Sequence, residues 1–212
     1  VDDIKQFRQW GSVTPGHPER DLAHGIENSS GPLGQGHAYA AGAAVAEKFL
    51  EARLGHTMMQ HKIYAYISDG GVQEGVSAEV GRLAGALGLN NLIMFYDAND
   101  IQLSTECGAV MDEDTAMKYR AWGWNVMNID GNDPDAIREA LAAANREENR
   151  PTLIIGDTVM AKGARQADGS SYEHSIKTHG APLGGDAYIN TVKNLGGDPD
   201  DPFRIFPRSE ER

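Results

Sequence analysis

The sequence has little cysteine, little positive charge and no long apolar run, and each shortage excludes a class of protein. Cys107 is the only cysteine, so no disulfide can form within the chain, as is typical of the reducing cytoplasm. Nineteen Lys and Arg against 31 Asp and Glu give a net charge of −12, which disfavours binding to nucleic acid or anionic lipid. The longest uncharged stretch, residues 28–46, is interrupted by glycine and proline, so we expect no membrane span.

Glycine, in contrast, is plentiful. The chain has 25 glycines among 212 residues, and they cluster beside apolar segments instead of forming a low-complexity tract. Such clusters are typical of loops that bind a ligand through their backbone. The length is sufficient for one large domain with its own hydrophobic core.

Strand-like and helix-like patterns alternate along the chain. This alternation predicts an α/β fold with a doubly wound, mostly parallel sheet and helices on both faces. We expect the apolar face of the longest helix at Ala38, Ala41, Val45, Phe49 and Ala52. The expected strands span residues 63–67, 92–96, 125–129 and 152–159, and the expected helices span 2–10, 33–54, 76–87, 114–122 and 135–146.

Polar residues follow the first two expected strands. Asp69, Gly70 and Gly71 come directly after one strand, and Asn99 follows the next. In parallel α/β sheets, ligands bind at the carboxyl ends of the strands. Mg²⁺ prefers oxygen ligands, and Asp69, Asn99 and the Ile101 carbonyl would supply three. The glycines would let a diphosphate approach the backbone. The pattern therefore predicts a cofactor that carries a diphosphate.

These residues also have simpler interpretations. Asp and Asn are common in turns and helix caps, so a purely structural role stays open for Asp69 and Asn99 taken singly. The loop of residues 31–36 (GPLGQG) either caps the following helix or offers bare backbone to a planar ring. A dinucleotide site is disfavoured because no Gly-x-Gly-x-x-Gly motif follows the first strand.

Two of the seven histidines stand out by their surroundings. His17 lies in the sequence GHPE and His179 in HGAPL, both loops that contain proline. An imidazole donates to phosphate and moves protons near neutral pH, so both are candidates for a phosphate and sugar site. The other five are interpreted as surface or turn residues, and Cys107 as structural.

The chain resembles the diphosphate-binding domain of transketolases, which are thiamine diphosphate enzymes, over nearly its full length. The resemblance rests on five segments in family order. They read DIKQFRQWGSVTPGHPE, GPLGQG, SDGGVQEGVSAEVGRLAGALGLNNLIMFYDAND, DEDTAMKYRAWGW and THGAPLG.

The resemblance implies a role for each matched residue. Asp69, Asn99 and the Ile101 carbonyl would ligate Mg²⁺, and Ca²⁺ or Mn²⁺ would substitute for it. His17 would bind the sugar donor, His179 would move protons near the reacting carbon, and Glu74 would link two active sites across a dimer interface. The implied contacts to thiamine diphosphate are Gly31, Leu33, Asp69, Gly70, Asn99 and His179.

The implied reaction is the reversible transfer of a two-carbon ketol unit from a ketose phosphate to an aldose phosphate, in the pentose phosphate pathway. Another thiamine diphosphate enzyme, such as dihydroxyacetone synthase, is the first alternative because it shares the same Asp and Asn pattern. A non-catalytic module that keeps the fold is the second. The retention of Asp69, Asn99, Glu74, His17 and His179 together argues against that module.

The sequence also departs from the family pattern. Ser68 stands where the family usually has glycine, and residues 160–165 (MAKGAR) replace a glycine-rich stretch. We expect residues 1–195 to form the diphosphate-binding domain without its N-terminal part, and residues 196–212 to form a linker towards a pyrimidine-binding domain. That domain, in the same or a partner chain, would complete the site, so we expect a cytoplasmic homodimer.

Overall fold

The computed structural model describes residues 1–206 and divides the chain into two compact units. The sheet unit comprises Gly31–Val159. The terminal unit comprises Val1–Ser30 and the chain from Met160 onward.

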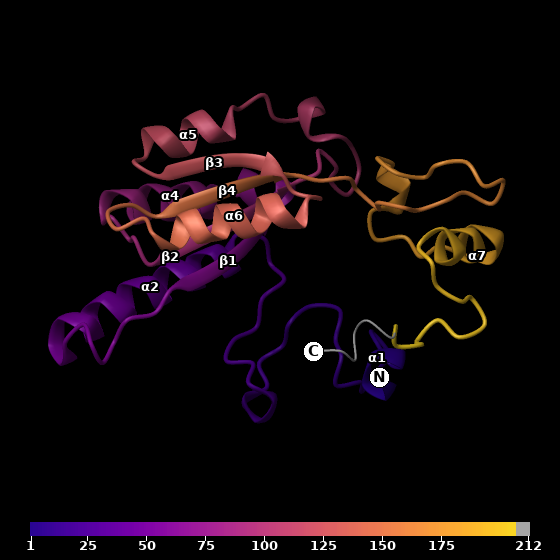
Figure 1. Ribbon diagram of the computed structural model, residues 1–212, viewed down its shortest axis with the longest axis horizontal. Helices are drawn as coiled ribbons and strands as arrows, with labels where there is room; N and C mark the ends of the chain where they lie inside the picture. Colours follow the sequence, from indigo (N-terminus) through magenta and orange to yellow (C-terminus); the bar gives the residue numbers. More distant parts are fainter. Residues whose placement is uncertain (207–212) are drawn as a thin grey trace. The chain divides into compact units, whose positions relative to one another are not determined.

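The sheet unit contains four parallel strands, and each was expected from the sequence. In space they follow the order β1-β2-β4-β3, from bottom to top in Figure 1. Because β1 and β2 are neighbours, Ile67 lies opposite Tyr96 and Ser68 lies opposite Asp97. The strands are β1 (Ile63–Ser68), β2 (Leu92–Ala98), β3 (Asn125–Asp130) and β4 (Thr152–Asp157).

Helices pack on both faces of this sheet. The alternation of side chains along β2 separates two cores: Leu92, Met94 and Tyr96 face one cluster, and Ile93 faces the other. The first cluster includes residues of α2, α4 and α5, and the second includes residues of α6. The predicted α/β class with helices on both faces is therefore confirmed. The helices of the sheet unit are α2 (Gln35–Leu54), α3 (Asp69–Gln73), α4 (Gly75–Ala86), α5 (Thr115–Ala121) and α6 (Pro134–Asn145), with the short 3₁₀ helix η2 (Cys107–Ala109).

Local sequence explains where two of these helices begin. Asp114 precedes α5, and its carboxylate accepts a hydrogen bond from the Met117 N–H at 2.7 Å. Asp133 precedes α6, accepts from the Asp135 N–H at 2.9 Å, and is followed by Pro134 at the first helical position. Proline suits that position because the first N–H groups of a helix have no partner within it.

The buried face of α2 differs from the expected one. Its buried residues are His37, Ala41, Ala44 and Glu47, whereas Phe49 is 58% exposed. The apolar pattern was misleading because two polar side chains take part in the packing. Glu47 is satisfied by a hydrogen bond from Asn91, and His37 lies edge-on to a buried tryptophan. The small alanines allow α2 to approach β1 and α4 closely.

Strand β1 has an apolar, aromatic sequence (IYAYI) that is typical of a buried strand, but most of its side chains are not buried. It lies at the edge of the four-stranded sheet, and its side chains alternate between partly buried and exposed. Tyr64 and Tyr66 are 57% and 69% exposed. Tyr66 stacks on Phe95 of β2, with the ring centroids 5.5 Å apart.

The terminal unit contains only short or polar elements. The expected helix at residues 2–10 is limited to α1 (Asp2–Lys5). The chain turns at Arg8, whose φ is 62°, and the Arg8 N–H donates to the Thr14 carbonyl at 2.9 Å. The prediction of a short amphipathic helix up to residue 10 was thus wrong beyond Lys5, because the segment folds back as a loop. The unit also contains the 3₁₀ helices η1 (Leu22–His24) and η3 (Ile176–Thr178).

Helix α7 (Gly185–Asn194) was not expected from the sequence. It has one buried residue, Thr191, and polar side chains hold it against the preceding loop. The Arg165 N–H donates to Thr191 Oγ1 at 2.8 Å, and Asn194 Nδ2 donates to the Gly163 carbonyl at 2.8 Å. Its apolar residues Tyr188, Ile189 and Val192 recur at helical spacing but are only partly buried, so hydrogen bonds supply much of its attachment.

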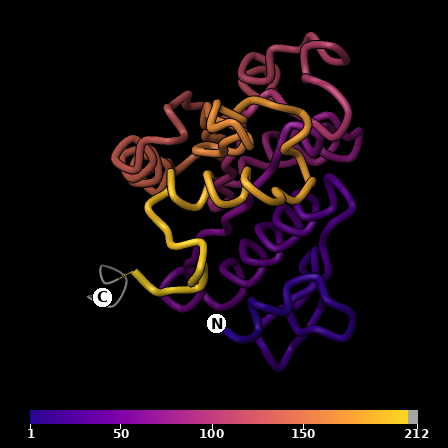
Figure 2. The backbone as a smooth tube through the Cα atoms, turned by 90° about the vertical axis from the view of Figure 1, so that its right-hand side faces the viewer, coloured from indigo at the N-terminus to yellow at the C-terminus, as the bar shows by residue number. Residues whose placement is uncertain are grey.

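The predicted linker begins after α7 and has no helix or strand up to Phe206 (Figure 2). The remainder of that predicted linker, residues 207–212, lies outside the described part of the chain. Within residues 1–206, no helix combines the length and apolarity needed to cross a membrane.

Candidate functional site

Asp69 lies buried at the carboxyl end of β1, as the first residue of α3. It is 3% exposed, and its carboxylate accepts three hydrogen bonds. Tyr96 Oη donates to Oδ1 at 2.6 Å, while the N–H groups of Asn99 and Asp100 each donate to Oδ2 at 3.1 Å. These donors come from β2 and the loop after it. The parallel pairing of β1 and β2 thus brings Asp69 and Asn99 together.

The charge of Asp69 is not balanced by a basic side chain. No ion pair among residues 1–206 involves this carboxylate, and all three donors are neutral. A buried carboxylate without a counter-charge is unfavourable unless a cation binds beside it. Residues 1–206 contain no group of three His, Cys, Asp or Glu side chains arranged to hold a metal ion. A metal at Asp69 would therefore need amide, carbonyl and cofactor oxygens as its other ligands.

The loop after β2 presents two such oxygens. Asn99 Oδ1 accepts a hydrogen bond from the Ile101 N–H at 3.1 Å, which leaves that amide oxygen one further acceptor position. Asp100 has a φ of 65°, and its carbonyl accepts from the Cys107 N–H at 3.0 Å. The Ile101 carbonyl accepts no hydrogen bond from the described residues. Asp69, Asn99 and the Ile101 carbonyl thus each keep at least one free acceptor position. Such a set of oxygens fits a hard cation such as Mg²⁺.

The predicted cofactor loop lies against the turn that carries Gly70. A Cβ added to Gly70 would lie 3.1 Å from Leu33 Cδ1, so Leu33 and Gly70 are in contact. Gly34 packs on the start of α4, where an added Cβ would lie 2.5 Å from Val76 Cγ1. Gly31 has a φ of 142°, and Gly34 has a φ of 81°, a backbone conformation that favours glycine. The loop 31–36 and the turn after β1 therefore form one surface.

Glu74 lies between α3 and α4 with an exposed side chain. Its carbonyl accepts hydrogen bonds from the Ser77 and Ala78 N–H groups at the start of α4. Among residues 1–206, no partner contacts its carboxylate by a hydrogen bond or an ion pair. The backbone of Glu74 therefore caps α4, and its side chain is free to meet another surface.

His17 and His179 both belong to the terminal unit. His17 is exposed in its loop. His179 follows η3, and its N–H donates to the Ile176 carbonyl at 3.2 Å. Its Nδ1 is buried but has no hydrogen-bond partner within the described part of the chain. An unpartnered buried nitrogen is unusual in folded proteins and is a position that a ligand can satisfy.

The sequence pattern had not singled out Tyr96 or the position of Cys107 beside Asp69. Burial, with the Asp69 carboxylate adding to it, raises the pKa of Tyr96 well above its ordinary value, so the hydroxyl remains a donor at neutral pH. The same two causes raise the pKa of the Cys107 thiol to about 12. Gln73 Nε2 donates to Cys107 Sγ at 3.7 Å. Only the strand register, in which Tyr96 lies opposite Ile67, places residue 96 next to the end of β1.

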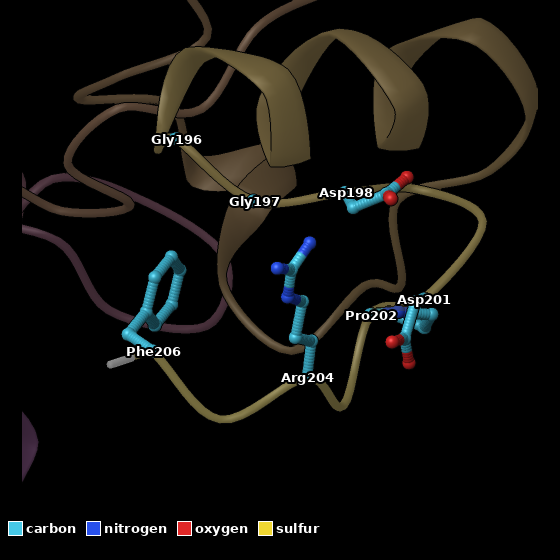
Figure 3. A pocket seen from close by; sticks show the side chains of 7 residues that line it. All are labelled: Gly196, Gly197, Asp198, Asp201, Pro202, Arg204 and Phe206. Carbon is cyan, nitrogen blue, oxygen red and sulfur yellow. The ribbon is translucent and has the colours of Figure 1, made fainter. Parts of the chain in front are cut away.

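Two hollows on the surface contain none of the predicted site residues. One lies in the terminal unit and has a volume near 200 Å³, with the Arg204 side chain extending towards Gly197 (Figure 3). The other, near 550 Å³, lies in the sheet unit beside Glu47, Lys62 and Asn91, at the amino ends of β1 and β2. Neither hollow is the predicted site at the carboxyl ends of these strands.

The comparisons with known proteins agree on one family. A family model described as "Transketolase, thiamine diphosphate binding domain" matches residues 1–210. The chain belongs to this transketolase domain family. The resemblance inferred from the sequence is therefore confirmed. The described function of the family model also agrees with the expected cofactor, thiamine diphosphate.

Individual transketolases are similar over most of the chain. Transketolase 1 of Vibrio cholerae is 44% identical over 209 residues, which cover 97% of this chain and 30% of that protein. The crystal structure of the Campylobacter jejuni transketolase superimposes with a TM-score of 0.90 at 40% identity, covering 100% of this chain and 32% of the other. The chain thus spans less than a third of the length of these transketolases.

A third relative was solved with a sugar phosphate. The Pichia stipitis transketolase in complex with sedoheptulose-7-phosphate superimposes with a TM-score of 0.87 at 32% identity. The alignment covers 97% of this chain and 30% of that one.

Proposed function

We propose that this chain is the diphosphate-binding part of a transketolase that transfers a two-carbon ketol unit reversibly from a ketose phosphate to an aldose phosphate. The observation that carries the proposal is the buried carboxylate of Asp69, which has three neutral donors and no basic partner. The family match supports the cofactor, and the sugar phosphate bound by the Pichia stipitis enzyme supports the substrate class.

In this proposal Mg²⁺ binds to Asp69, Asn99 and the Ile101 carbonyl, and Ca²⁺ or Mn²⁺ substitutes for it. Asp69, Asn99 and the Ile101 carbonyl would hold the cation, whose positive charge would offset the charges of Asp69 and of the cofactor diphosphate. Gly70 offers its N–H to the diphosphate without a side chain in the way. Gly31 and Leu33 contact the thiamine rings. Support comes from the contact between Leu33 and Gly70, which joins the two glycine-rich segments.

The residues outside this centre handle substrate and protons. His17 binds the hydroxyl groups of the sugar donor, and His179 holds or moves a proton near the reacting carbon. The unpartnered Nδ1 of His179 supports such a role. When bound, thiamine diphosphate supplies the electron sink for carbon–carbon bond cleavage. The protein orients the sugar phosphate and keeps His179 within reach of the reacting carbon.

We infer that the site is completed by a second polypeptide surface. Glu74 has an exposed carboxylate, which suits a position at the interface between two active sites of a homodimer. A pyrimidine-binding domain of the same or a partner chain covers the other side of the cofactor. The proposed setting is the pentose phosphate pathway in the cytoplasm.

Calorimetric titration of thiamine diphosphate into the protein tests the cofactor site. Three conditions are compared: Mg²⁺ present, EDTA present, and Asp69→Ala with Mg²⁺. We expect binding heat only in the first condition, because the diphosphate needs the cation and the cation needs Asp69. Equal binding of thiamine diphosphate in all three would overturn the proposed metal site.

The choice of acceptor separates transketolase from dihydroxyacetone synthase. The protein, together with whatever completes its site, is given a ketose phosphate and either erythrose 4-phosphate or formaldehyde. We expect turnover with erythrose 4-phosphate to exceed turnover with formaldehyde, as the similarity to transketolases supports. A preference for formaldehyde would instead assign the protein to the synthase class.

A further inference from the structure

The Tyr96 side chain hydrogen-bonds directly to the carboxylate of Asp69. It lies on β2, is 5% exposed, and its hydroxyl donates to Asp69 Oδ1 at 2.6 Å. The strand register fixes this contact, because Tyr96 lies opposite Ile67, two residues before Asp69. Tyr96 therefore reaches the carboxylate from a rigid part of the sheet and not from a loop.

The hydrogen bonds of Asp69 leave one acceptor position free. Each carboxylate oxygen offers about two lone-pair positions. Oδ2 receives the N–H groups of Asn99 and Asp100, so both of its positions are used. Oδ1 receives the Tyr96 hydroxyl, and the Cys107 thiol beside the carboxylate is only a weak donor, so one position remains for a stronger ligand among the described contacts. The free position lies on the oxygen that Tyr96 holds.

We propose that Tyr96 is a positioning residue, which fixes the Asp69 carboxylate so that the free position on Oδ1 is presented to a divalent cation. The inference rests on the proposed function, in which Asp69 is a metal ligand. Without the hydroxyl, Oδ1 has two free positions and the carboxylate is held only through Oδ2. Groups that orient a metal ligand commonly change metal affinity about 10–100-fold when removed.

The two cations Mg²⁺ and Ca²⁺ respond differently to a loosely held ligand. Mg²⁺ requires near-ideal octahedral geometry with short bonds, whereas Ca²⁺ accepts longer bonds and variable geometry. Loss of the Tyr96 hydroxyl therefore weakens Mg²⁺ binding more than Ca²⁺ binding. A merely structural role for Tyr96 would affect both cations equally.

The test compares Tyr96→Phe with Tyr119→Phe. Tyr119 is a matched control, because it is a buried tyrosine of the same unit, 1% exposed, whose hydroxyl makes no hydrogen bond among residues 1–206. The affinities for Mg²⁺ and for Ca²⁺ are measured by calorimetry at saturating thiamine diphosphate. We expect Tyr96→Phe to weaken Mg²⁺ binding about 10–100-fold and Ca²⁺ binding less, with Tyr119→Phe like the wild type.

A double-mutant cycle adds a second readout. In an Asp69→Asn background, Tyr96→Phe should change the residual Mg²⁺ affinity little, because the ligand that it orients has lost its charge. An undiminished effect of Tyr96→Phe in that background would overturn the positioning role. The metal-free melting temperature of each variant shows that it is folded.

The outcomes separate the inference from the function on which it rests. If the wild type, together with the polypeptide surface that completes its site, shows no cation-dependent binding of thiamine diphosphate, the proposed function is wrong. If the wild type binds but Tyr96→Phe keeps its Mg²⁺ affinity, or loses both cations equally, the positioning role is wrong and the proposed function stands.

Discussion

Glu47 and Asn91 form a buried hydrogen bond between α2 and the start of β2. Asn91 Nδ2 donates to Glu47 Oε2 at 2.6 Å and to the Ala44 carbonyl at 3.0 Å. Both residues are 3% exposed. The pair lies at the amino ends of the strands, whereas Asp69 lies at their carboxyl ends. At the amino ends of the strands, polar contacts thus join α2 to β2. The carboxyl ends of the strands carry the proposed site.

Removing the Asn91 amide should destabilise the fold. Asn91→Ala leaves the buried Glu47 carboxylate without its shortest hydrogen bond, and we expect a loss of about 2–4 kcal/mol in the free energy of unfolding. Asn128→Ala is the control, because Asn128 is exposed on β3. It should change stability by less than about 0.5 kcal/mol. Urea unfolding followed by circular dichroism measures both, and equal stabilities would contradict the role of the pair.

Gly34 should be intolerant of a side chain. Its φ is 81°, and an added Cβ would lie 2.5 Å from Val76 Cγ1 and 2.9 Å from Ser77 Oγ. Gly34→Ala should therefore cost about 1–3 kcal/mol through strain and crowding. Gly36→Ala is the matched control in α2, where an added Cβ meets nothing within 4 Å. It should be neutral or stabilising by up to about 1 kcal/mol, and thermal unfolding of the two variants should separate them.

His37 should make the protein less stable in acid. Burial lowers the pKa of His37 to about 4 from 6.5, and neither ring nitrogen has a hydrogen-bond partner among residues 1–206. Between these values the unfolded chain binds a proton that the folded chain excludes. The contribution to stability is therefore complete above pH 6.5 and falls as the pH approaches 4, by about 3 kcal/mol in total.

The variant His37→Leu isolates this effect. It removes the titrating group and should flatten the loss of unfolding free energy between pH 6.5 and 4 relative to the wild type. His61→Gln is the control because His61 is exposed, and its pH profile should follow the wild type. Parallel profiles for His37→Leu and the wild type would show that His37 does not cause the acid dependence.

Much of the sheet unit could be predicted from the sequence, because its strands are short apolar segments bounded by turn residues. The strands at residues 92–96 and 125–129 were found close to their observed bounds, as was helix α4. The prediction failed where polar groups take the place of apolar ones. The buried face of α2 contains His37 and Glu47, and the only fully buried residue of α7 is the polar Thr191, which accepts a hydrogen bond from the Arg165 N–H.

Part of the candidate site could also be predicted from the sequence pattern. Asp69 and Asn99 each end an expected strand, and a parallel sheet brings such ends together, so their proximity followed from the pattern. Tyr96 was not found, because a tyrosine in an apolar strand is indistinguishable from an ordinary core residue. Its role depends on the hydroxyl reaching a carboxylate 27 positions earlier in the chain.

The sequence by itself determined the α/β class, the strand ends that carry Asp69 and Asn99, and the family, because periodicity and motifs are local properties of a chain. Only the tertiary structure decided that Asp69 is buried without a basic partner, that Leu33 contacts Gly70, and that one position on Oδ1 remains free. These facts depend on the strand order and register, which bring distant segments within hydrogen-bond reach and are set by packing of the whole unit.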